Sequence, residues 1–561
     1  MNSSACRVET RLDLMTIVEV YFRTAGYSLA MWIGRTVPRS EPLGLDSSRA
    51  RFESIIRKRL GKDLEKSSNA RIIKPVVILE PRANMRTNGM LRMAFLFALC
   101  MPVYAQPSPR VVDQINFPKT VDLSASSWTE AFTALNKVLS REYPFTHWRR
   151  IGWTQLYNQY STRIADAERR NDFDAFRQIL REYIYSFPDG HVQIHGRFDD
   201  LRYREIGGGF GFALGQLDDG RVVSYTVVDG SPAAKAEIQP GAEILALDGK
   251  PIKDVAPAVS ILWTRKPVST SAQRRIEQFR YLSRAPVGTP VEVVFRNPGE
   301  RAAMRATLTA VDDHFTYLDQ SQLPSPVPEQ RRQLFSDKVL DNGIGYIAIF
   351  GEDSKTMPEF ETILQQMIDA KVPALILDLR RNQGGDDEAV AHIASYFDTR
   401  ESVFEYAEYF DEDTGKFEIL RSGTLYVTPR RPHFNGPVIA LIGSSTGSSG
   451  EGVAMEIARA PRGRTLGFDS TAGYFGIDGG TIKLPGEIEV DYPIGASLDA
   501  KRRIQLDSDY TGRGGVSPQV RIPRNYDNML AAGQGQDVEL KAAERKLAKM
   551  PERRRRFQPA R

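Results

Sequence analysis

Residues 438–451 read V-I-A-L-I-G-S-S-T-G-S-S-G-E, an apolar run that gives way to small and hydroxyl-bearing residues before a helical pattern. A serine at such a junction lies beside the free N–H groups of a helix start, where the helix dipole stabilises a developing oxyanion. The same letters fit a capping box, with Ser448 as the cap and Glu451 as its partner. The stretch therefore indicates either a nucleophile or an ordinary helix cap.

A second junction of the same kind lies upstream. Residues 374–379 read A-L-I-L-D-L, the pattern of a buried strand, and are followed by R-R-N-Q-G-G and a helix-like segment at 387–397. Two strand-to-helix junctions in one α/β core can form a crevice. Gly384 and Gly385 let backbone approach a ligand closely and offer unhindered N–H groups, which suits an oxyanion hole. The alternative is a plain turn.

Four short segments, taken in series, resemble the tail-specific or C-terminal-processing serine protease family, including its tricorn-like and retinoid-binding-protein-like relatives. These segments are D-L-R-R-N-Q-G-G at 378–385, S-S-G-E at 448–451, the loop at 467–473 and G-V-S-P at 515–518. The resemblance spans roughly residues 120 to 545 and implies a multidomain α/β protein with a crotonase-like α/β catalytic core. It implies Ser448 as nucleophile, with backbone N–H groups near Gly384, Gly385 and Ser449 as the oxyanion hole.

The chain departs from the branch of the family that uses a lysine base. Tyr474 stands at the position of that lysine, and Lys483 is the nearest lysine downstream. A lysine base would need burial to lose its proton near neutral pH, whereas a solvated lysine at a strand edge is the simpler interpretation of Lys483.

A histidine offers the alternative base. Residues 186–194 read S-F-P-D-G-H-V-Q-I, which places His191 after a turn and resembles the D-x-H segment of the family branch that pairs its serine with histidine. Imidazole, with an ordinary pKa of about 6.5, can accept a serine proton and return it to a leaving amine. We therefore expect His191 to be the base. The other histidines, which sit in no comparable motif, are His147, His195, His314, His392 and His433.

The resemblance also implies a carboxylate that orients the imidazole, shortly before the G-V-S-P segment. Residues 506–514 offer Asp507 and Asp509, of which Asp507 is preferred because it is closer to the preceding strand-like run. The alternatives are an acidic surface turn or a cation-binding loop. Glu451 is a weaker rival, expected instead as the cap partner of Ser448.

Residues 206–250 resemble a PDZ domain of the bacterial protease type, with a glycine-rich loop, a strand, a Gly-Ser-Pro-Ala-Ala turn and an Asp-Gly hairpin. In such a module, free loop N–H groups capture a terminal carboxylate while a sheet edge takes the peptide as an added strand. The expected peptide-binding residues are Gly208, Gly209, Phe210, Gly211 and Phe212. The alternative is a tight loop in a β-rich spacer.

Helical periodicity predicts a small N-terminal bundle. A capping box at Ser127 and Glu130 begins one helix, and others are expected at 153–169 and 173–185. Three prolines at alternate positions from 324 to 328 indicate a linker. The expected domains are 106–200 (helical), 201–315 (PDZ-like), 316–335 (Pro-rich linker), 336–525 (α/β protease core) and 526–561 (C-terminal helical tail).

Residues 90–105 have a basic start, a short apolar run and a small-residue end, as a secretory signal does. We therefore expect a signal peptide at 85–105 and interpret residues 1–84 as a spurious upstream extension. A cytoplasmic N-terminal domain with an internal apolar segment is the alternative. The two cysteines, Cys6 and Cys100, precede the expected mature start. These features predict a periplasmic or secreted protein without a stable membrane anchor after signal cleavage.

Composition is that of an ordinary globular protein, with 41% hydrophobic residues and a formal net charge of +5 over 561 residues. No basic stripe with interleaved aromatic residues predicts nucleic-acid binding, and no metal or cofactor site is expected. The favoured interpretation is an exported serine endopeptidase that acts on proteins or peptides near their C-termini. The alternatives are a catalytically inactive peptide-binding scaffold and an acyl-CoA-handling crotonase relative. The oligomeric state stays open.

Overall fold

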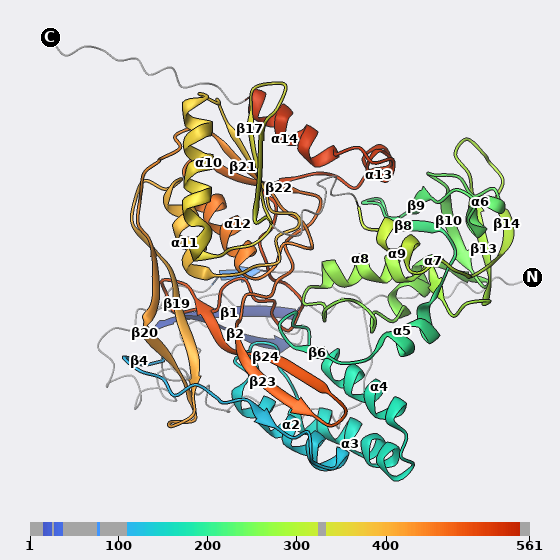
Figure 1. Ribbon diagram of the computed structural model, residues 1–561, viewed down its shortest axis with the longest axis horizontal. Coiled ribbons are helices and arrows are strands. Elements are labelled where there is room, and N and C mark those ends of the chain that lie inside the picture. The colour runs from blue at the N-terminus through green and yellow to red at the C-terminus, as the bar shows by residue number, and fades with distance from the viewer. Residues whose placement is uncertain (1–14, 25–26, 37–75, 79–108, 324–332, 550–561) are drawn as a thin grey trace, which may run out of the picture. The chain divides into compact units, whose positions relative to one another are not determined.

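The computed structural model describes residues 15–24, 27–36, 76–78, 109–323 and 333–549 (Figure 1). The chain divides into two compact units, 1–106 and 107–561. In the first unit, β1 (Met15–Thr24) pairs antiparallel with both β2 (Tyr27–Thr36) and β3 (Val76–Ile78). The predicted signal peptide at 85–105 lies outside the described residues.

The centre of the second unit is a six-stranded sheet in the order β16-β17-β18-β21-β22-β25. Its strands are β16 (Phe335–Val339), β17 (Gly345–Ile349), β18 (Leu375–Asp378), β21 (Val438–Leu441), β22 (Gly463–Gly467) and β25 (Val520–Arg521). All are parallel except β16, which is antiparallel to β17. Parallel strands covered on both faces need apolar side chains in continuous runs, which explains the two buried-strand patterns in the sequence.

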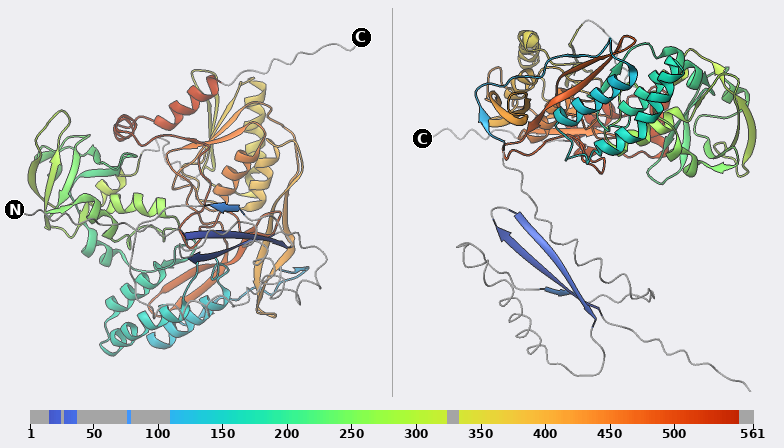
Figure 2. Two further views of the ribbon diagram at one scale, coloured as in Figure 1. Left: turned by 180° about the vertical axis from the view of Figure 1, so that it is seen from behind. Right: turned by 90° about the horizontal axis from the view of Figure 1, so that it is seen from below.

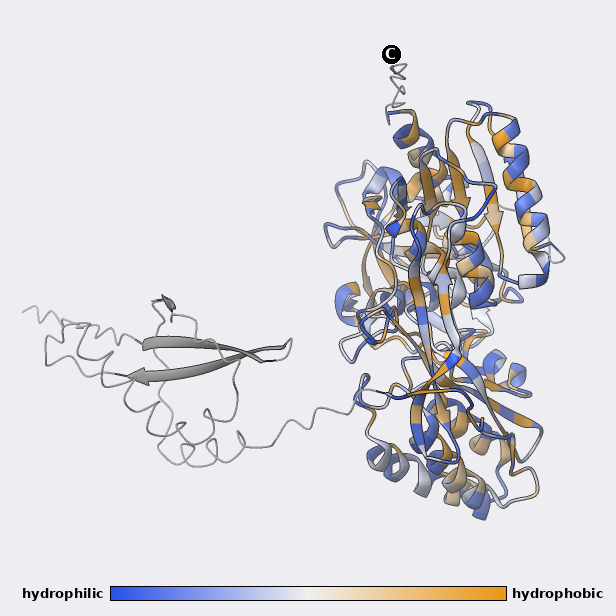
Figure 3. Cartoon of the chain, turned by 90° about the vertical axis from the view of Figure 1, so that its left-hand side faces the viewer, coloured by the Kyte–Doolittle hydropathy of each residue, from blue (hydrophilic) through white to orange (hydrophobic). Residues whose placement is uncertain are grey.

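Alternate residues of these strands enter two different cores. Leu375, Leu377 and Ala440 pack with α10 (Met357–Asp369), α11 (Asp387–Ser395) and α12 (Ser449–Arg459). Ile376, Ile439 and Leu441 face the other side, where they pack with α14 (Val538–Ala548). Side chains alternate across a strand with a period of two, so one run supplies both faces. The helices, in contrast, carry one hydrophobic and one hydrophilic side, as the colours of Figure 3 show.

A second, twisted sheet has the order β4-β20-β19-β24-β23-β5, and β6 also pairs with β24. Its strands are β4 (Val111–Val112), β20 (Lys416–Val427), β19 (Ser402–Asp411), β24 (Ile488–Leu498), β23 (Ile477–Leu484), β5 (Val121–Asp122) and β6 (Gln193–His195). The predicted helices form as α2 (Trp128–Glu142), α3 (Trp153–Arg169) and α4 (Phe173–Ile184), and Ser127 and Glu130 make the expected capping box.

These three helices do not stand alone as a bundle. Phe132, Leu180 and Ile184 share one core with Ile482 and Val490 of the second sheet. The helices therefore form a layer on that sheet, as Figure 2 shows. The sequence pattern predicted the helices but not the sheet that they cover, because strands from distant parts of the chain build it.

A third sheet has the order β14-β13-β10-β9-β8, with β11 on β10, and β8 is an edge strand. Its strands are β8 (Phe212–Gln216), β9 (Val222–Val227), β10 (Glu243–Leu247), β11 (Lys250–Pro251), β13 (Pro290–Arg296) and β14 (Met304–Thr309). The helices beside it are α5 (Asp199–Ile206), α6 (Pro232–Lys235), α7 (Ile252–Val255), η1 (Ala256–Ala258) and α8 (Ser271–Tyr281). A small sheet, β12 (Arg284–Ala285), β7 (Gly208–Gly209) and β15 (Val311–Asp312), adjoins it.

The predicted linker at 316–335 is shorter than expected, because α9 (Thr316–Gln320) occupies its start and β16 begins at Phe335. Residues 324–332, which hold the prolines, lie outside the described residues. The C-terminal segment forms α13 (Tyr526–Gly533) and α14. Thr226 of β9 donates a hydrogen bond to the carbonyl oxygen of Gly533 at 3.1 Å, so α13 contacts the third sheet. Within the described part of the chain, no helix combines the length and apolarity that a membrane span requires.

A buried arginine joins the C-terminal helix to the central sheet. Arg380 donates to Asp378 at 2.9 and 2.6 Å, to Asp537 at 2.8 Å and to Glu539 at 3.0 Å. Tyr346 also donates to Asp378, at 2.8 Å. Removal of this one cation would leave three carboxylates in a low-dielectric site without their partner.

We expect Arg380→Met to lower the free energy of unfolding by about 3–5 kcal/mol, the usual cost of breaking a buried ion network. Arg503→Met is the matched control, because Arg503 pairs with Asp499 at the surface and is expected to lose at most about 1 kcal/mol. Urea unfolding curves measure the free energy of unfolding of both variants, and equal m-values make the two losses comparable. Equal stability of the two variants would contradict the assigned role of Arg380.

Candidate active site

Ser448 lies at the point where the loop after β21 enters α12. Its backbone has φ 51° and ψ −135°, a conformation that non-glycine residues rarely adopt. The Ser448 N–H donates to the carbonyl oxygen of Tyr474 at 3.0 Å, and the preceding Gly447 N–H donates to that of Asn382 at 3.0 Å. Two neighbouring loops therefore fix the turn that presents the Ser448 side chain.

Ser448 does not cap α12 with its side chain, so the capping-box interpretation is wrong. The Glu451 carboxylate instead accepts hydrogen bonds from Thr471, from the Gly473 N–H at 2.8 Å and from the Tyr474 N–H at 3.0 Å. Burial raises the pKa of Glu451 to about 8. Glu451 therefore holds the loop that backs Ser448.

His191 comes from the turn after α4, and its ring is almost fully buried. Its backbone N–H donates to Asp189 Oδ1 at 2.9 Å, and the preceding Gly190 N–H donates to Ser269 Oγ at 3.0 Å. His191 Nε2 lies 3.0 Å from Ser448 Oγ, although 257 positions separate the two residues. The structure thus places the expected base and the expected nucleophile within hydrogen-bond distance.

The expected orienting acid does not occupy its predicted place. Among the described residues, His191 Nδ1 is buried without a hydrogen-bond partner, and neither Asp507 nor Asp509 forms an ion pair with the ring. Asp509 lies at the surface, where it accepts the Thr511 N–H at 2.7 Å. The prediction that Asp507 or Asp509 contacts His191 is therefore wrong, and Asp509 is part of an acidic surface turn.

Asp507 belongs to a different, fully buried cluster. Arg149 Nη2 lies 2.9 Å from Asp507 Oδ1, and Arg149 Nη1 lies 3.6 Å from Asp189 Oδ2. The Tyr143 hydroxyl donates to Asp189 at 2.7 Å, and the Phe475 N–H donates to Asp507 at 3.1 Å. Arg149 therefore links the turn that carries His191 to the loop that supports Ser448.

The charges of this cluster favour one protonated carboxyl group. A single guanidinium faces two carboxylates with no solvent exposure. Burial raises the pKa of Asp507 to about 7, despite the opposing effect of Arg149. A proton on Asp507 near neutral pH leaves Arg149 and Asp189 as a balanced pair.

Asn382 organises the glycine pair beside Ser448. Its Oδ1 accepts the Gly384 N–H at 2.9 Å, and its amide donates to the buried Glu352 at 2.5 Å. Burial raises the pKa of Glu352 to about 8. The Gly384 N–H is therefore already engaged, which contradicts the expectation that it is free for an oxyanion.

Because Gly384 has no side chain, Ser448 and the start of α12 pack directly against it. Gly384 has φ +106°, and an added Cβ would lie 2.4 Å from Ser448 Cβ, 2.9 Å from its Oγ and 3.0 Å from the Ser449 nitrogen. Among the described residues, no hydrogen bond engages the Ser449 or Gly385 N–H. Ser449 Oγ is engaged, with Gly385 O at 2.9 Å and Asp387 at 2.8 Å.

Tyr474 stands at the position of the absent lysine, and its buried ring packs between two loops. An added Cβ on Gly190 or Gly447 would lie 2.4 or 2.2 Å from Tyr474 atoms, so the ring fills the space beside both glycines. Its ring meets His191 edge-on, with centroids 4.8 Å apart. Lys483 is exposed on β23 and is no candidate base.

The glycine-rich segment of the PDZ-like module is not the open loop that the sequence predicts. Gly208 and Gly209 pair with β12 on one side and β15 on the other, and the Phe210 N–H donates to the Ser283 carbonyl oxygen at 3.2 Å. Gly211 and Phe212 are buried as well. Gly208, Gly209 and Phe210 therefore do not form the expected open carboxylate-binding loop.

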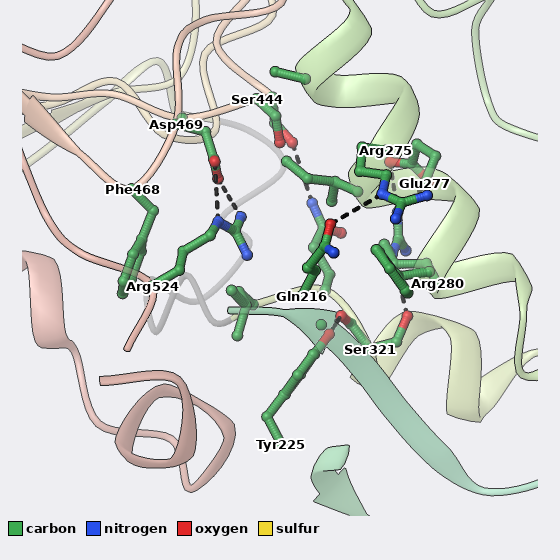
Figure 4. Close-up of a pocket in the computed structure, with 18 of the residues that line it drawn as sticks. Gln216, Tyr225, Arg275, Glu277, Arg280, Ser321, Ser444, Phe468, Asp469 and Arg524 are labelled. Atoms are coloured by element: carbon green, nitrogen blue, oxygen red, sulfur yellow. Dashed lines mark hydrogen bonds and ion pairs between the residues drawn. The ribbon is translucent and has the colours of Figure 1, made fainter. Parts of the chain in front are cut away.

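A cavity of about 310 Å³ lies instead between the far end of β8, helix α8 and the catalytic core (Figure 4). Gln216 and Arg275 meet on the PDZ-like side, at 3.1 Å, and Arg524 pairs with Asp469 on the core side. Ser444 of the loop after β21 also lines it. The cavity thus adjoins the loop that leads to Ser448.

Two residues of the site had weak or no sequence signals. Asn382 stands inside the D-L-R-R-N-Q-G-G segment, two residues before Gly384. That spacing is the signal that could identify it as the residue that holds the glycine pair. Arg149 lies in no motif, because its partners at 189 and 507 are distant in the chain. In the described residues, no cluster of three or more His, Cys, Asp or Glu side chains could hold a metal ion.

Comparison with known proteins finds matches to two family models. Residues 343–522 match the model of peptidase family S41, and residues 223–267 match that of the PDZ domain. The carboxy-terminal processing protease CtpB of Bacillus subtilis (strain 168) is 20% identical over 321 residues, which is 56% of this chain and 55% of CtpB. CtpA of the same organism is 22% identical over 305 residues, 54% of this chain and 53% of CtpA. The chain spans about half the length of these curated relatives.

A solved structure shares the fold. Mature CPAF complexed with lactacystin superposes with a TM-score of 0.53 at 14% sequence identity, over 76% of this chain and 98% of that chain. The predicted multidomain α/β architecture with a PDZ-like module is confirmed. So is the resemblance to the tail-specific protease family: the match to the peptidase S41 model at 343–522 follows the match to the PDZ model at 223–267.

Proposed function

We propose that this protein is a serine endopeptidase that cleaves proteins or peptides through an acyl-enzyme on Ser448, with His191 as general base. One observation carries the proposal, the 3.0 Å distance between His191 Nε2 and Ser448 Oγ. The strained backbone of Ser448 supports it, because strain of this kind concentrates at functional sites.

In the proposed reaction, His191 Nε2 takes the proton of the Ser448 hydroxyl as Oγ attacks the substrate carbonyl carbon. The tetrahedral intermediate collapses when the histidine returns that proton to the leaving amine, which frees the first product. A water molecule, deprotonated by the same nitrogen, then hydrolyses the acyl-enzyme. Assigning these roles by geometry follows the logic of serine proteases on unrelated folds.

The oxyanion would lie beside Ser448 Oγ, near Gly384 and the start of α12. The Ser449 N–H is the nearest donor to this space, and the positive end of the helix dipole adds to its effect. We include the Gly385 N–H as a second candidate donor. Asn382 would keep the Gly384 peptide in place beside Ser448.

The substrate would reach this site along the PDZ domain. Strand β8 is an edge strand, so it can pair with an extended peptide, and the cavity between β8, α8 and Ser444 would receive the next side chains. By their names, the relatives in Bacillus subtilis process carboxy-terminal ends. We extend that to this chain and propose protein tails as substrates, encountered in the periplasm or outside the cell.

A peptide-binding scaffold without catalysis is the second candidate. The buried Nδ1 of His191, which has no carboxylate partner among the described residues, favours it. The short Ser448–His191 distance favours the enzyme.

Ser448→Ala and His191→Ala are each expected to lower kcat/KM on an unstructured protein at least about 10³-fold, because a nucleophile and its base act as a unit. Fluorophosphonate labelling of Ser448 should be lost in both variants. His195→Ala is the matched control, since His195 lies on the neighbouring strand and pairs with Asp491 at 3.0 Å, away from the serine. Full cleavage by Ser448→Ala would refute the nucleophile, and an inert wild-type chain would favour the scaffold.

Gly384→Ala is expected to lower kcat about 10²- to 10³-fold, the usual cost of a damaged oxyanion site. The new Cβ would enter the space over Ser448 and would meet the strain of φ +106°. Gly152→Ala serves as the control, because its nearest contacts would be at 3.5 Å and its φ is −92°. Wild-type kcat in Gly384→Ala would contradict this placement of the oxyanion.

Asp507→Asn is expected to keep kcat/KM within about tenfold of wild type. Asparagine retains the acceptor for Arg149 and Phe475, and Asp507 is already partly protonated near pH 7. An acid that oriented the histidine would instead cost about 10⁴-fold. Steady-state kinetics at pH 7.5, with thermal unfolding to verify folding, separates the two outcomes.

A further inference from the structure

Asp478 stands between two irregularities in the hairpin of β23 and β24. The register is Ile477 with Gly495, Asp478 with Pro493, and Gly480 with Tyr492, so one residue is extra on each strand, first on β24 and then on β23. Bulges of this kind re-aim side chains and are frequent next to active sites.

The two glycines after Asp478 make the second bulge possible. Gly479 has φ +157°, and an added Cβ there would lie 2.8 Å from Ile494; at Gly480 it would lie 2.2 Å from the Tyr492 ring. Larger residues at these positions would therefore displace the hairpin. The two bulges and the two glycines together set the direction of the Asp478 side chain.

That direction is toward the catalytic histidine. Asp478 Oδ2 lies 3.9 Å from His191 Nε2, the same nitrogen that faces Ser448. The His191 side chain is 3% exposed, whereas that of Asp478 is 59% exposed. A solvated carboxylate thus lies against a buried ring on its reactive side.

Other charged and titratable groups around His191 are arranged differently. Asp189 contacts its backbone N–H, and Arg149 lies behind Asp189. The Tyr474 ring meets the imidazole edge-on. Lys266, in the segment before α8, places its Nζ 5.1 Å from the centre of the Tyr474 ring. Arg265 precedes Lys266 in the same segment. Asp478 is the carboxylate within 4 Å of a His191 ring nitrogen among the described residues.

We propose that Asp478 is a positioning residue that stabilises the protonated form of His191, in place of a carboxylate at Nδ1. This inference rests on the proposed peptidase function. A carboxylate at this distance favours the imidazolium that forms when the histidine has taken the serine proton. Because Asp478 is well exposed, water screens the interaction and the effect is moderate.

The test compares Asp478→Asn with Asp491→Asn, a control from β24 in which the carboxylate faces His195, outside the proposed machinery. The rate of fluorophosphonate labelling of Ser448 is measured from pH 5 to 9. In Asp478→Asn we expect the midpoint of the acidic limb to fall by about 0.5 pH unit, because the imidazolium loses its partner. The plateau rate should fall about 3- to 10-fold, and Asp478→Glu should restore part of both.

The shift of the midpoint separates the proposed role from structural damage, which would lower the rate without moving the midpoint. An unchanged midpoint in Asp478→Asn would overturn the inference.

Failure of the proposed function would look different. If wild-type Ser448 is not labelled at any pH, the peptidase proposal fails, and NMR titration of the histidine ring signals, assigned with His191→Ala, still tests the electrostatic pairing. A lower His191 midpoint in Asp478→Asn supports the pairing, and an equal midpoint overturns it.

Discussion

The buried contact of Arg149 with Asp189 and Asp507 is the constraint on which the site depends. His191 and Ser448 come from different layers, the helical layer on the second sheet and the central parallel sheet. Neither layer alone determines their distance. Arg149 reaches the His191 turn through Asp189 and the loop beside Ser448 through Asp507, so one guanidinium bridges the segments that carry base and nucleophile. Glu451 and Asn382 then fix the two loops on the serine side.

Local patterns predicted much of the fold. The capping box at Ser127 and the apolar runs that became β18 and β21 depend on neighbouring residues, and they formed as expected. The second sheet was missed because its pairings join strands from 111 to 498, and no local pattern records which strands meet. The glycine-rich segment at 208–212 was misjudged for the same reason, since β12 and β15, which occupy its hydrogen bonds, come from later in the chain.

The residues of the candidate site also fall into two groups, those that a local motif predicts and those that depend on distant contacts. Ser448 and His191 lie in short motifs whose chemistry is legible from residue type, and the structure brings them together. The prediction that Asp507 orients His191 was wrong, because Asp507 pairs with the buried Arg149, which its spacing from the G-V-S-P segment does not reveal. Asp478 had no motif at all, since its direction results from a mismatch between two paired strands.

Tyr474 restricts how this site could have arisen. Its ring fills the space beside Gly190 on the histidine turn and beside Gly447 on the serine loop, so both glycines and the tyrosine are mutually dependent. A lysine in its place would remove packing from both loops at once and would bring a charge against the edge of the imidazole. A lysine at position 474 would therefore require coordinated substitutions beside Gly190 and Gly447.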